Sequence, residues 1–495
     1  MKLLFDTNIL IPLEPTSSRD LSAASHAAMD LFCRAQEANL DVFLHPDAKK
    51  EIGRDRDTER RKMRETLLRK YPLLPDPPPV PSRVLKVLGN PPTGSNDWVD
   101  NHLLAAVLAN AVDLLITEDR GIHKKAARLS VSDRVLTIDD ALATVRGLFP
   151  VLPSSPPAVR DTKAHVLVPD DPIFDSIRKD YHPHFDKWFS KCRLEHRQTW
   201  AIPIPQSTHV KGFCIVNPEA KEDYSSYGKE GKILKICTLK VSEEYRGYRF
   251  GELLLKPVLA YARANSYDWV FVTVFAKYDQ LINLLHDFGF EEIDRETAVG
   301  EKILFKPIRW SGADKESLDP MRFSVRFGPG TMKLRKVPTY IVPIQPRYTR
   351  VLFPEGESQV EMFPGQHPFG NSIRKAYLCN ASIRKIARGD GLLFYTSEIV
   401  KGITALGVVE STLVSDDPNE IARYAGKQTV YSYSEIESLC LTRPVLAILF
   451  RQVKVLETPI SFRRLRARSI LSGPPQSIQR MPEEAKAWLE NLTGI

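Results

Sequence analysis

The sequence predicts a multidomain α/β protein with three folded parts: a parallel sheet with helices, an α+β domain and a small β-barrel. Three observations support this prediction. The chain has 495 residues, more than one compact core usually holds. In its first third, short apolar runs alternate with helical patterns, which favours a parallel sheet covered by helices. In its last third, apolar strand patterns follow one another around glycine turns.

Two stretches divide the chain. "FPVLPSSPPAVRDT" (149–162) is rich in Pro and Ser and has no periodicity, which is typical of a linker. "WSGADKESLDPMRFSVRFGPGTMK" (310–333) mixes Gly, Pro and charge and forms a weaker break. The predicted divisions are an N-terminal domain 1–149, a linker 150–162, a middle domain 163–310, a linker 311–335 and a C-terminal domain 336–495.

Composition and charge bear on the cellular compartment of the protein and on the partners it could bind. The formal net charge is +8, and residues 331–495 carry an excess of seven cations. A basic surface favours polyanions such as nucleic acid, although it also serves solubility alone, and both interpretations stay open. The six cysteines stand singly, without the spacing of a metal site, which indicates a reducing, cytoplasmic setting. No apolar stretch is long enough to cross a bilayer, so no membrane partner is expected.

Acidic residues follow the two predicted strands of the first domain. "KLLF" runs into Asp6, and "VDLLIT" (112–117) runs into Glu118 and Asp119. Because sites in parallel sheets form at the carboxyl ends of the strands, these acids are expected to share one edge. Asp97 and Asp100 stand three apart at the start of a helical pattern and are expected to point the same way.

Clustered carboxylates repel one another unless a cation lies among them. Oxygen ligands without His or Cys favour Mg²⁺ or Mn²⁺, which activate water and stabilise a phosphodiester under attack. Each acid also has an ordinary explanation. Asp97 suits a helix cap, Asp100 the helix dipole and Asp6 a turn.

The motifs "FDTNIL", "HPDAKKEI", "NDWVDNHLLAA" and "LLITEDRGI" resemble those of PIN domains over about residues 1–148. That family consists of metal-dependent ribonucleases, many of them toxins of toxin–antitoxin pairs. The resemblance implies an RNA substrate and an inhibitory antitoxin protein as partners. It implies Asp6, Glu51, Asp100 and Asp119 as catalytic, metal-binding acids, with Asp97 as an auxiliary metal ligand. Glu118 is an alternative to Asp119 as the metal-binding acid, and Asp47 and Asp55 are alternatives to Glu51. Thr7, Asn8 and Thr117 are expected to orient the carboxylates by hydrogen bonding.

The sequence of the middle domain predicts an anion site. "GKILKICTLKV" (231–241) predicts a strand, "SEEYRGYRFGELLLKPVLAYARANS" (242–266) a glycine-containing loop leading into a helix, and "DWVFVTVFA" (268–276) a second strand. A helix N-terminus behind such a loop binds phosphate through backbone N–H groups. A plain helix start on a small α/β core is the alternative.

The order of these elements, with "RGYRFG" and "LLHDFGF", resembles the acetyl-coenzyme A binding core of GNAT acetyltransferases over about residues 163–308. Arg249 stands where that family has its middle glycine, and Leu285 where a tyrosine general acid often stands; His286, Tyr278 and Tyr248 are possible substitutes. The resemblance implies these cofactor-binding residues: Leu239, Val241, Arg246, Gly247, Tyr248, Arg249, Phe250, Gly251 and Asn283. The acceptor amine stays open between a protein, a tRNA-linked amino acid and a metabolite.

In the last third, "GDGLLFYTS" and "ITALGVVESTLV" resemble strands of a PUA-like barrel of the ASCH or EVE type, a group that binds RNA or modified bases. Cationic side chains in this part could contact phosphates, and aromatic rings could stack on a base. In the alternative interpretation, the same rings form the core of the barrel. The residues expected to contact nucleic acid are Arg374, Lys375, Tyr377, Arg384, Lys385, Arg388 and Tyr395.

The leading hypothesis is a metal-dependent endoribonuclease of PIN type whose C-terminal domain selects RNA, toxin-like or active in stress. The alternative is an acetyl-coenzyme A dependent N-acetyltransferase that uses the PIN-like domain as a binding platform. A third hypothesis is a non-catalytic sensor of nucleic acid or cofactor.

Overall fold

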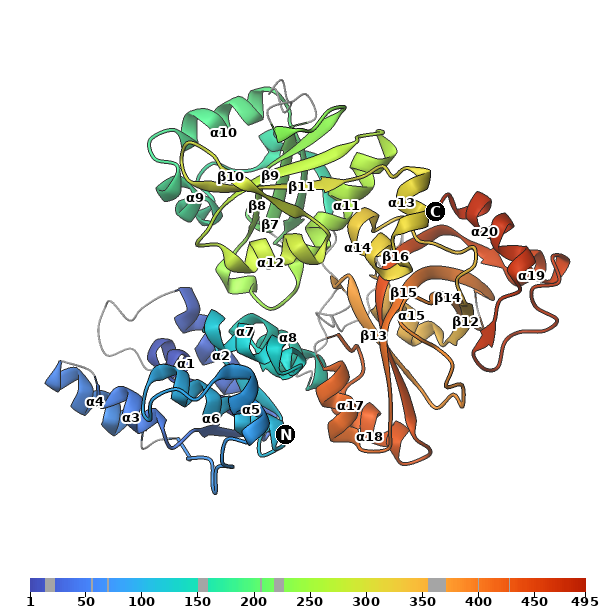
Figure 1. Ribbon diagram of the computed structural model, residues 1–495. Helices are drawn as coiled ribbons and strands as arrows, with labels where there is room; N and C mark the ends of the chain where they lie inside the picture. The colour runs from blue at the N-terminus through green and yellow to red at the C-terminus, as the bar shows by residue number, and fades with distance from the viewer. Residues whose placement is uncertain are drawn as a thin grey trace. The chain divides into compact units, whose positions relative to one another are not determined.

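The structure is a computed structural model (Figure 1). It describes residues 1–13, 23–54, 57–68, 71–149, 159–204, 207–217, 227–354, 371–398, 400–426 and 428–495. The chain forms two compact units. Unit 1 comprises Met1–Val151 and Leu413–Val445, and unit 2 comprises Leu152–Thr412 and Leu446–Ile495. Among the described residues, no helix combines the length and the apolar character needed to span a bilayer.

Unit 1 contains a four-stranded parallel sheet, as the sequence predicts. Its order is β2-β1-β3-β4. Alternate residues of β1 pack into different cores: Leu3 and Phe5 on one face, Leu4 on the other. Burial on both faces explains why the sequences of these strands are continuous apolar runs. The strands are β1 (Lys2–Phe5), β2 (Asp41–Leu44), β3 (Leu114–Ile116) and β4 (Val135–Leu136).

Helices cover this sheet (Figure 1). A turn at Gly53 and Arg54 ends the helix Ala48–Ile52, and the next helix begins at Thr58. The helices are α1 (Thr7–Leu13), α2 (Ala23–Glu37), α3 (Ala48–Ile52), α4 (Thr58–Leu68), α5 (Ser82–Leu88), α6 (Asn96–Leu108), α7 (Arg120–Arg128) and α8 (Ile138–Leu148).

Two helices of unit 1 come from the C-terminal part of the sequence. They are α17 (Pro418–Ala425) and α18 (Tyr433–Cys440). Arg423 pairs with Asp113 at 2.9 Å, and the ring of Tyr433 stacks on Phe149 at 5.6 Å. The predicted division at 336–495 kept this segment in the C-terminal domain. Its place in unit 1 depends on contacts about 300 residues apart, which no local pattern reveals.

The buried neutral His45 contributes a part of the stability of unit 1 that is lost in mild acid. The His45 side chain is 2% exposed. Burial lowers its pKa from 6.5 to about 4, although Asp47 lies 3.3 Å away, and Lys50 and His102 also act on it. The unfolded chain takes up this proton near pH 6.5, so stability that is complete above that pH is lost as the pH falls toward 4. We expect a loss of about 2 kcal/mol between pH 7 and pH 5.

The melting temperature of the wild type and of His45→Asn, measured across this range, checks the prediction. The variant should be less stable at pH 7 and should lose less on acidification. Equal losses in the two proteins would contradict it.

Unit 2 begins with a seven-stranded sheet in the order β10-β11-β9-β8-β7-β6-β5. All its pairings are antiparallel except that of β8 with β9, which is parallel. The strands are β5 (Arg160–Lys163), β6 (Gln198–Pro203), β7 (Val210–Asn217), β8 (Ile233–Val241), β9 (Trp269–Phe275), β10 (Glu291–Glu296) and β11 (Glu301–Pro307). Of the predicted linker 150–162, residues 150–158 lie outside the described part, and β5 begins two residues later.

Helices cover both faces of this sheet. The helices α11 (Phe250–Ala264) and α12 (Asp279–Asp287) pack over one core, and α9 (Asp175–Asp180) and α10 (Phe185–Leu194) over the other. The two faces therefore belong to different layers, with the parallel pair β8/β9 between them (Figure 1).

The segment 311–335, predicted as a linker, contains α13 (Gly312–Ser317) and α14 (Pro320–Phe327). Phe323 and Phe327 are buried, and both rings contact Trp310. Lys306 on β11 donates to the carbonyl of Arg326 at 2.8 Å. The aromatic residues at helical spacing explain why this segment is folded against the sheet and is not an open connection.

The last sheet has six strands in the order β13-β16-β15-β14-β12-β17. Among the described residues β13 and β17 are its open ends, so the predicted closed barrel is not confirmed. Strand patterns in a sequence do not reveal whether the two edge strands pair. The elements are β12 (Thr339–Ile344), α15 (Pro346–Leu352), β13 (Arg374–Cys379), β14 (Gly391–Thr396), β15 (Gly402–Ser415), β16 (Val445–Ser461), α19 (Phe462–Ala467), β17 (Gln479–Arg480) and α20 (Lys486–Thr493).

Candidate functional site

The parallel strands β8 and β9 separate part of the way along. Their pairing runs from Ile233 with Trp269 to Ile236 with Val272. Beyond that point β8 continues to Val241 and β9 to Phe275 without pairing to each other. An opening therefore forms in the middle of the sheet, with backbone N–H and C=O groups on its edges.

The loop after β8 leads into the start of α11 beside this opening. Gly247 has φ 75°, and Arg249 has φ 58° and ψ 28°, a left-handed conformation. Arg249 thus adopts the backbone conformation that a glycine holds easily, at a cost of about 1–2 kcal/mol. Arg249 therefore replaces the expected glycine, but its backbone keeps the conformation that a glycine would adopt there.

The N-terminus of α11 carries no side-chain cap. Its first N–H groups are therefore available to an anion, and the helix dipole favours one. A Cβ on Gly251 would lie 2.8 Å from Cδ2 of Leu284 on α12, so the glycine permits close packing of the two helices. These features fit the diphosphate of coenzyme A.

The predicted cofactor residues are distributed around this loop. Phe250 is buried in the core under α11, and Leu239 and Val241 pack against the same core. Arg246 donates to Gln280 of α12 at 3.1 Å, and Asn283 is exposed on α12. The structure brings the loop and the α12 residues to one end of the opening.

Residues directly before β13 bond to the loop and to the first turn of α11. Glu252, in the first turn of α11, accepts from the Ile373 backbone N–H at 2.7 Å and from the Ser372 hydroxyl at 2.9 Å. Asn371 donates to the backbone carbonyl of Tyr248 at 3.0 Å. At the other end of α12, Arg451 of β16 donates to the carbonyl of Asp287. The last sheet therefore supports both helices that border the opening.

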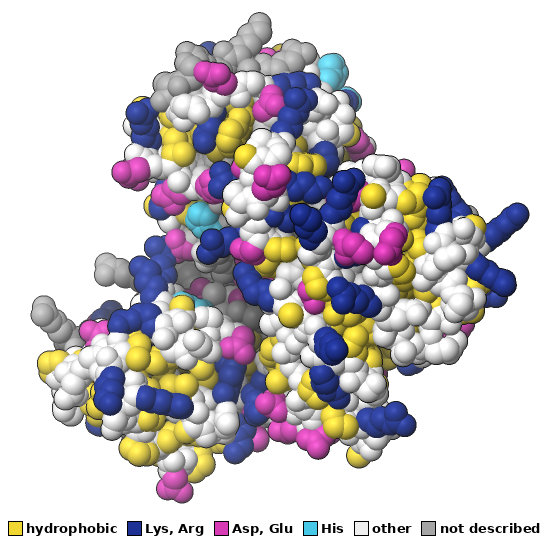
Figure 2. All heavy atoms as spheres, turned by 45° about the vertical axis from the view of Figure 1, so that its right-hand side comes forward, with side chains coloured by type: hydrophobic (Ala, Val, Ile, Leu, Met, Phe, Trp, Pro, Cys, Tyr) yellow, Lys and Arg dark blue, Asp and Glu magenta, His cyan; other side chains and the backbone are white. Residues whose placement is uncertain are grey.

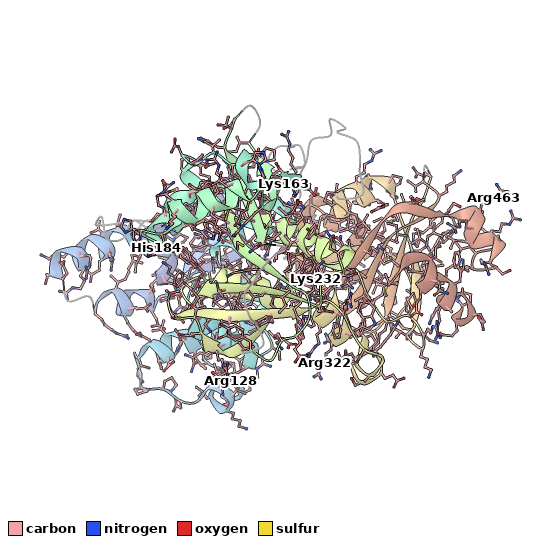
Figure 3. The ribbon with its side chains drawn as sticks, turned by 90° about the horizontal axis from the view of Figure 1, so that it is seen from above. Arg128, Lys163, His184, Lys232, Arg322 and Arg463 are labelled. Atoms are coloured by element: carbon pink, nitrogen blue, oxygen red, sulfur yellow. The ribbon has the colours of Figure 1, made fainter. Side chains whose placement is uncertain are left out.

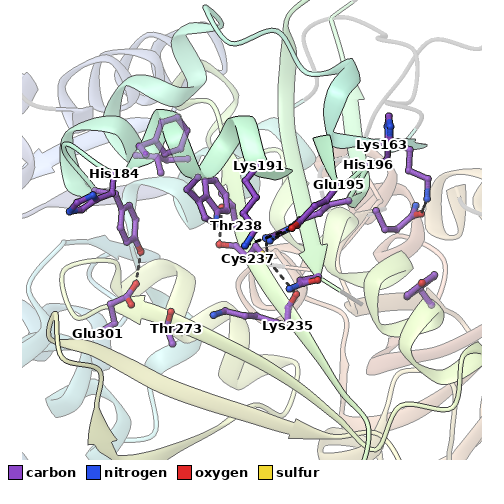
Figure 4. A pocket seen from close by; sticks show the side chains of 18 residues that line it. Lys163, His184, Lys191, Glu195, His196, Lys235, Cys237, Thr238, Thr273 and Glu301 are labelled. Atoms are coloured by element: carbon purple, nitrogen blue, oxygen red, sulfur yellow. Dashed lines mark hydrogen bonds and ion pairs between the residues drawn. The ribbon is translucent and has the colours of Figure 1, made fainter. Parts of the chain in front are cut away.

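A cavity of about 1090 Å³ lies where β8 and β9 separate (Figure 4). Thr238 of β8 and Thr273 of β9 both line it, so the opening leads into it. Glu301 of β11 also lines it and is 6% exposed. The hydroxyl of Tyr181 donates to this carboxylate. A buried carboxylate at the strand opening can accept a proton from a substrate held in the cavity.

Two tyrosines stand near the mouth of the opening. Tyr278, directly before α12, donates its hydroxyl to Asp180. Burial and then this hydrogen bond raise the pKa of Tyr278 well above its usual value. Burial and the hydrogen bond to Glu301 do the same for the pKa of Tyr181. Both hydroxyls therefore stay protonated at neutral pH.

Leu285, at the position of the expected tyrosine, is fully buried in the core. Of the possible substitutes, His286 bonds the carbonyl of Phe290, Tyr248 packs on Phe250, and Tyr278 donates to Asp180. The sequence reasoning missed Tyr181 and Glu301. Their meeting depends on the pairing of β11 with β9, and no local motif marks it.

In unit 1, Asp6 is buried among polar side chains after β1. Its carboxylate accepts from Thr117 at 2.7 Å and from Asn8 at 2.8 Å, and Thr7 donates to Glu51 at 2.6 Å. Burial, opposed by the bond from Thr117 and reinforced by the charge of Glu51, raises the pKa of Asp6 to about 7. The orienting roles expected of Thr7, Asn8 and Thr117 agree with these contacts.

The other acids of unit 1 have partners of their own. Lys125 on α7 bridges Asp97 at 2.6 Å and Asp100 at 2.7 Å. Asp119 caps α7 by accepting from the N–H of Gly121 at 2.5 Å, and Glu118 accepts from the N–H of Ile138 at 2.8 Å. Of the competitors of Glu51, Asp47 pairs with Lys50, and Asp55 lies outside the described residues.

Within the described part of the chain, no group of three or more His, Cys, Asp or Glu side chains is arranged to hold a metal ion. The residues therefore do not fit Mg²⁺ or Mn²⁺ as they stand, because Lys125 supplies the positive charge expected from the metal.

The residues expected to contact nucleic acid are divided between the interior and the surface. Lys375 is fully buried, and Tyr377 and Tyr395 are 7% and 1% exposed. Arg374 pairs with Glu410 at 2.9 Å. Lys375, Tyr377 and Tyr395 form part of the sheet core, because most residues of β13 and β14 are buried, whereas the Arg374 side chain is partly exposed at the start of β13. Arg384, Lys385 and Arg388 are exposed in the turn before β14.

Figure 2 shows Lys and Arg side chains scattered over the visible face, with acidic and apolar side chains between them. Arg463, on α19, projects outward in Figure 3. The excess of cations in the last third is thus dispersed on the faces in view.

Comparison with known proteins identifies the middle part of the chain. A family model described as "Acetyltransferase (GNAT) family" matches residues 166–290, and confirms the predicted GNAT-like domain. No curated protein matches the chain.

Solved structures resemble parts of the chain. An ASCH protein from Zymomonas mobilis has 17% identity and a TM-score of 0.25, and the match covers 31% of this chain and 94% of that one. A putative GNAT acetyltransferase from Desulfovibrio desulfuricans has 14% identity and a TM-score of 0.24, over 31% and 99%. A putative acetyltransferase from Salmonella typhimurium, solved with acetyl-coenzyme A, has 13% identity and a TM-score of 0.25, over 32% and 97%.

Proposed function

We propose that unit 2 transfers an acetyl group from acetyl-coenzyme A to a primary amine. The observation that carries this proposal is the separation of β8 from β9, with an uncapped helix N-terminus beside the opening and a cavity leading from it. The family match over 166–290 supports the same interpretation. Bound acetyl-coenzyme A would supply the acetyl group as a thioester.

The chain's own residues supply the proton transfers. Glu301 accepts a proton from the ammonium group of the acceptor, which makes the amine nucleophilic. The new N–C bond forms as the C–S bond breaks, and a tyrosine hydroxyl donates a proton to the departing sulfur. The proton that the nitrogen loses as the amide forms returns through solvent to that tyrosine. Tyr278 is our choice for this donor, since it follows β9 at the opening. Tyr181 holds Glu301 in place.

The proposal is tested by binding and by thiol release. Saturating acetyl-coenzyme A should raise the melting temperature by about 5 °C, and amines should provoke release of free thiol. Arg246→Ala should reduce the shift, and Gly251→Trp should erase it. Arg309→Ala is the matched control, since Arg309 pairs with Asp268 at 3.4 Å outside the opening. An unchanged melting temperature with the cofactor would refute the proposal.

A second candidate is metal-dependent RNA cleavage by unit 1. It is favoured by one observation: the hydroxyl of Thr7 lies 2.6 Å from a carboxylate oxygen of Glu51 and 3.3 Å from one of Asp6, so two acids from separate elements lie close together. Cleavage would require Lys125 to leave Asp97 and Asp100. Incubation with RNA and Mn²⁺ tests it: cutting should stop with EDTA and with Asp6→Asn, and activity that survives both rules it out. RNA recognition by the last sheet and an antitoxin partner remain predictions attached to this candidate.

A further inference from the structure

The cavity where β8 and β9 separate, which would hold the acceptor amine, has charges of opposite sign in different parts of its lining. Figure 4 shows Glu301 and His184 at one end, and Lys163 and His196 at the other. Four Lys or Arg side chains line the cavity against two carboxylates. One of those carboxylates, Glu195, is used by Arg197 at 2.8 Å, so the end away from Glu301 has an excess of positive charge.

Arg197 is a buried cation of the lining, at 9% exposed, and its contact with Cys237 places its guanidinium between the two ends (Figure 4). Its Nε and Nη2 atoms meet Glu195, and its Nη1 atom meets the sulfur of Cys237 at 3.4 Å. A thiol is a weak acceptor, whereas a guanidinium edge binds carboxylate or phosphate strongly. The Nη1 edge of Arg197 would therefore gain by exchanging the sulfur for an anionic oxygen.

Lys163 adds positive charge at the end of the cavity away from Glu301. Its ammonium donates to the side-chain oxygen of Gln198 at 2.5 Å, which is a neutral partner, so its charge is not cancelled there. The walls between the two ends include the rings of Phe185 and Trp188. A cavity of about 1090 Å³ is larger than a simple alkylamine needs.

We infer that the acceptor is an amine that also carries a carboxylate or a phosphate, with its amine beside Glu301 and its anionic group on Arg197, where Lys163 adds positive charge from the far end of the cavity. This inference rests on the proposed acetyltransferase function. The anion fixes the orientation of the acceptor, because a reversed molecule would place its negative charge on Glu301.

Two pairs of acceptors test the inference by thiol release from acetyl-coenzyme A. 6-Aminohexanoate is compared with hexylamine, which lacks the carboxylate, and O-phosphoethanolamine with ethanolamine, which lacks the phosphate. At least one anionic member should exceed its partner in kcat/KM by about tenfold or more. The pair that shows the difference identifies the anion.

Variants locate the effect in the cavity. Lys163→Gln should raise KM for the preferred anionic acceptor about tenfold and leave the neutral amine unchanged. Lys232→Gln is the matched control, because Lys232 bonds the carbonyl of Asn265 and does not line the cavity. Both lysines are labelled in Figure 3. Arg197→Lys keeps the charge but loses the guanidinium edge, and should also raise KM.

The inference is overturned if hexylamine and ethanolamine serve as well as their anionic partners, if no anionic acceptor is used, or if Lys163→Gln affects both classes alike. The melting shift with acetyl-coenzyme A separates these failures from failure of the proposed function, because cofactor binding persists when only the acceptor class is wrong.

Discussion

Replacement of Glu301 by Gln should lower kcat for acetyl transfer by about 10²- to 10⁴-fold, the usual contribution of a positioned general base. The amide keeps the shape of the side chain and still accepts the hydrogen bond of Tyr181, but it cannot take the proton of the ammonium group. The loss should shrink as the pH rises, since free amine becomes available without the base. Acetyl-coenzyme A binding should not change.

The rate is measured as thiol release across about pH 6–10, below and above the usual amine pKa, with cofactor affinity measured separately. Glu292→Gln is the matched control, because Glu292 lies on the neighbouring strand β10 and pairs with Lys302 at 2.7 Å outside the cavity. A Glu301→Gln enzyme with normal kcat at neutral pH would show that this carboxylate is not the base.

Removal of the Glu252 carboxylate should weaken both the fold and the cofactor site. Glu252→Ala leaves the N–H of Ile373 and the hydroxyl of Ser372 buried without their acceptor. We expect a loss of about 3 kcal/mol in the free energy of unfolding. Since the same carboxylate fixes the start of α11, the Kd for acetyl-coenzyme A should rise by about tenfold.

Chemical denaturation and calorimetric titration measure the two effects. Ser372→Ala removes the bond to Glu252 and the longer one from the Arg374 N–H at 3.3 Å, and should cost about 1 kcal/mol with a smaller change in Kd. Glu316→Ala, at an exposed position of α13, should change neither quantity. If Glu252→Ala is destabilised but binds the cofactor normally, the carboxylate supports the fold and not the site.

Local patterns predicted the parallel sheet of unit 1 and the strand–loop–helix core of unit 2. Strands buried on both faces leave continuous apolar runs, and the loop around Phe250 carries Gly247 and Gly251. The positions of Asp6 and Glu118 at one sheet edge followed from the same reasoning, because β1 and β3 are neighbours.

What the sequence could not reveal depends on pairing between distant elements. Lys125 reaches Asp97 and Asp100 from another helix, and Glu301 reaches Tyr181 across 120 residues. Periodicity describes one element at a time. It therefore predicted Asp97 and Asp100 but not the lysine that pairs with them, and the cofactor-binding loop but not Glu301.

The burial of Lys375 and Tyr395 has a similar cause. Each lies in a strand whose apolar neighbours are covered on both faces, and a strand pattern does not tell which polar residue is enclosed.

Hydrogen exchange with and without acetyl-coenzyme A tests the central claim most directly. If the cofactor binds where β8 and β9 separate, slowed exchange should concentrate at the amides of Leu239–Val241 and of Gly247–Glu252, with little change in unit 1. Slowed exchange confined to other segments, or none at saturating cofactor, would contradict the account.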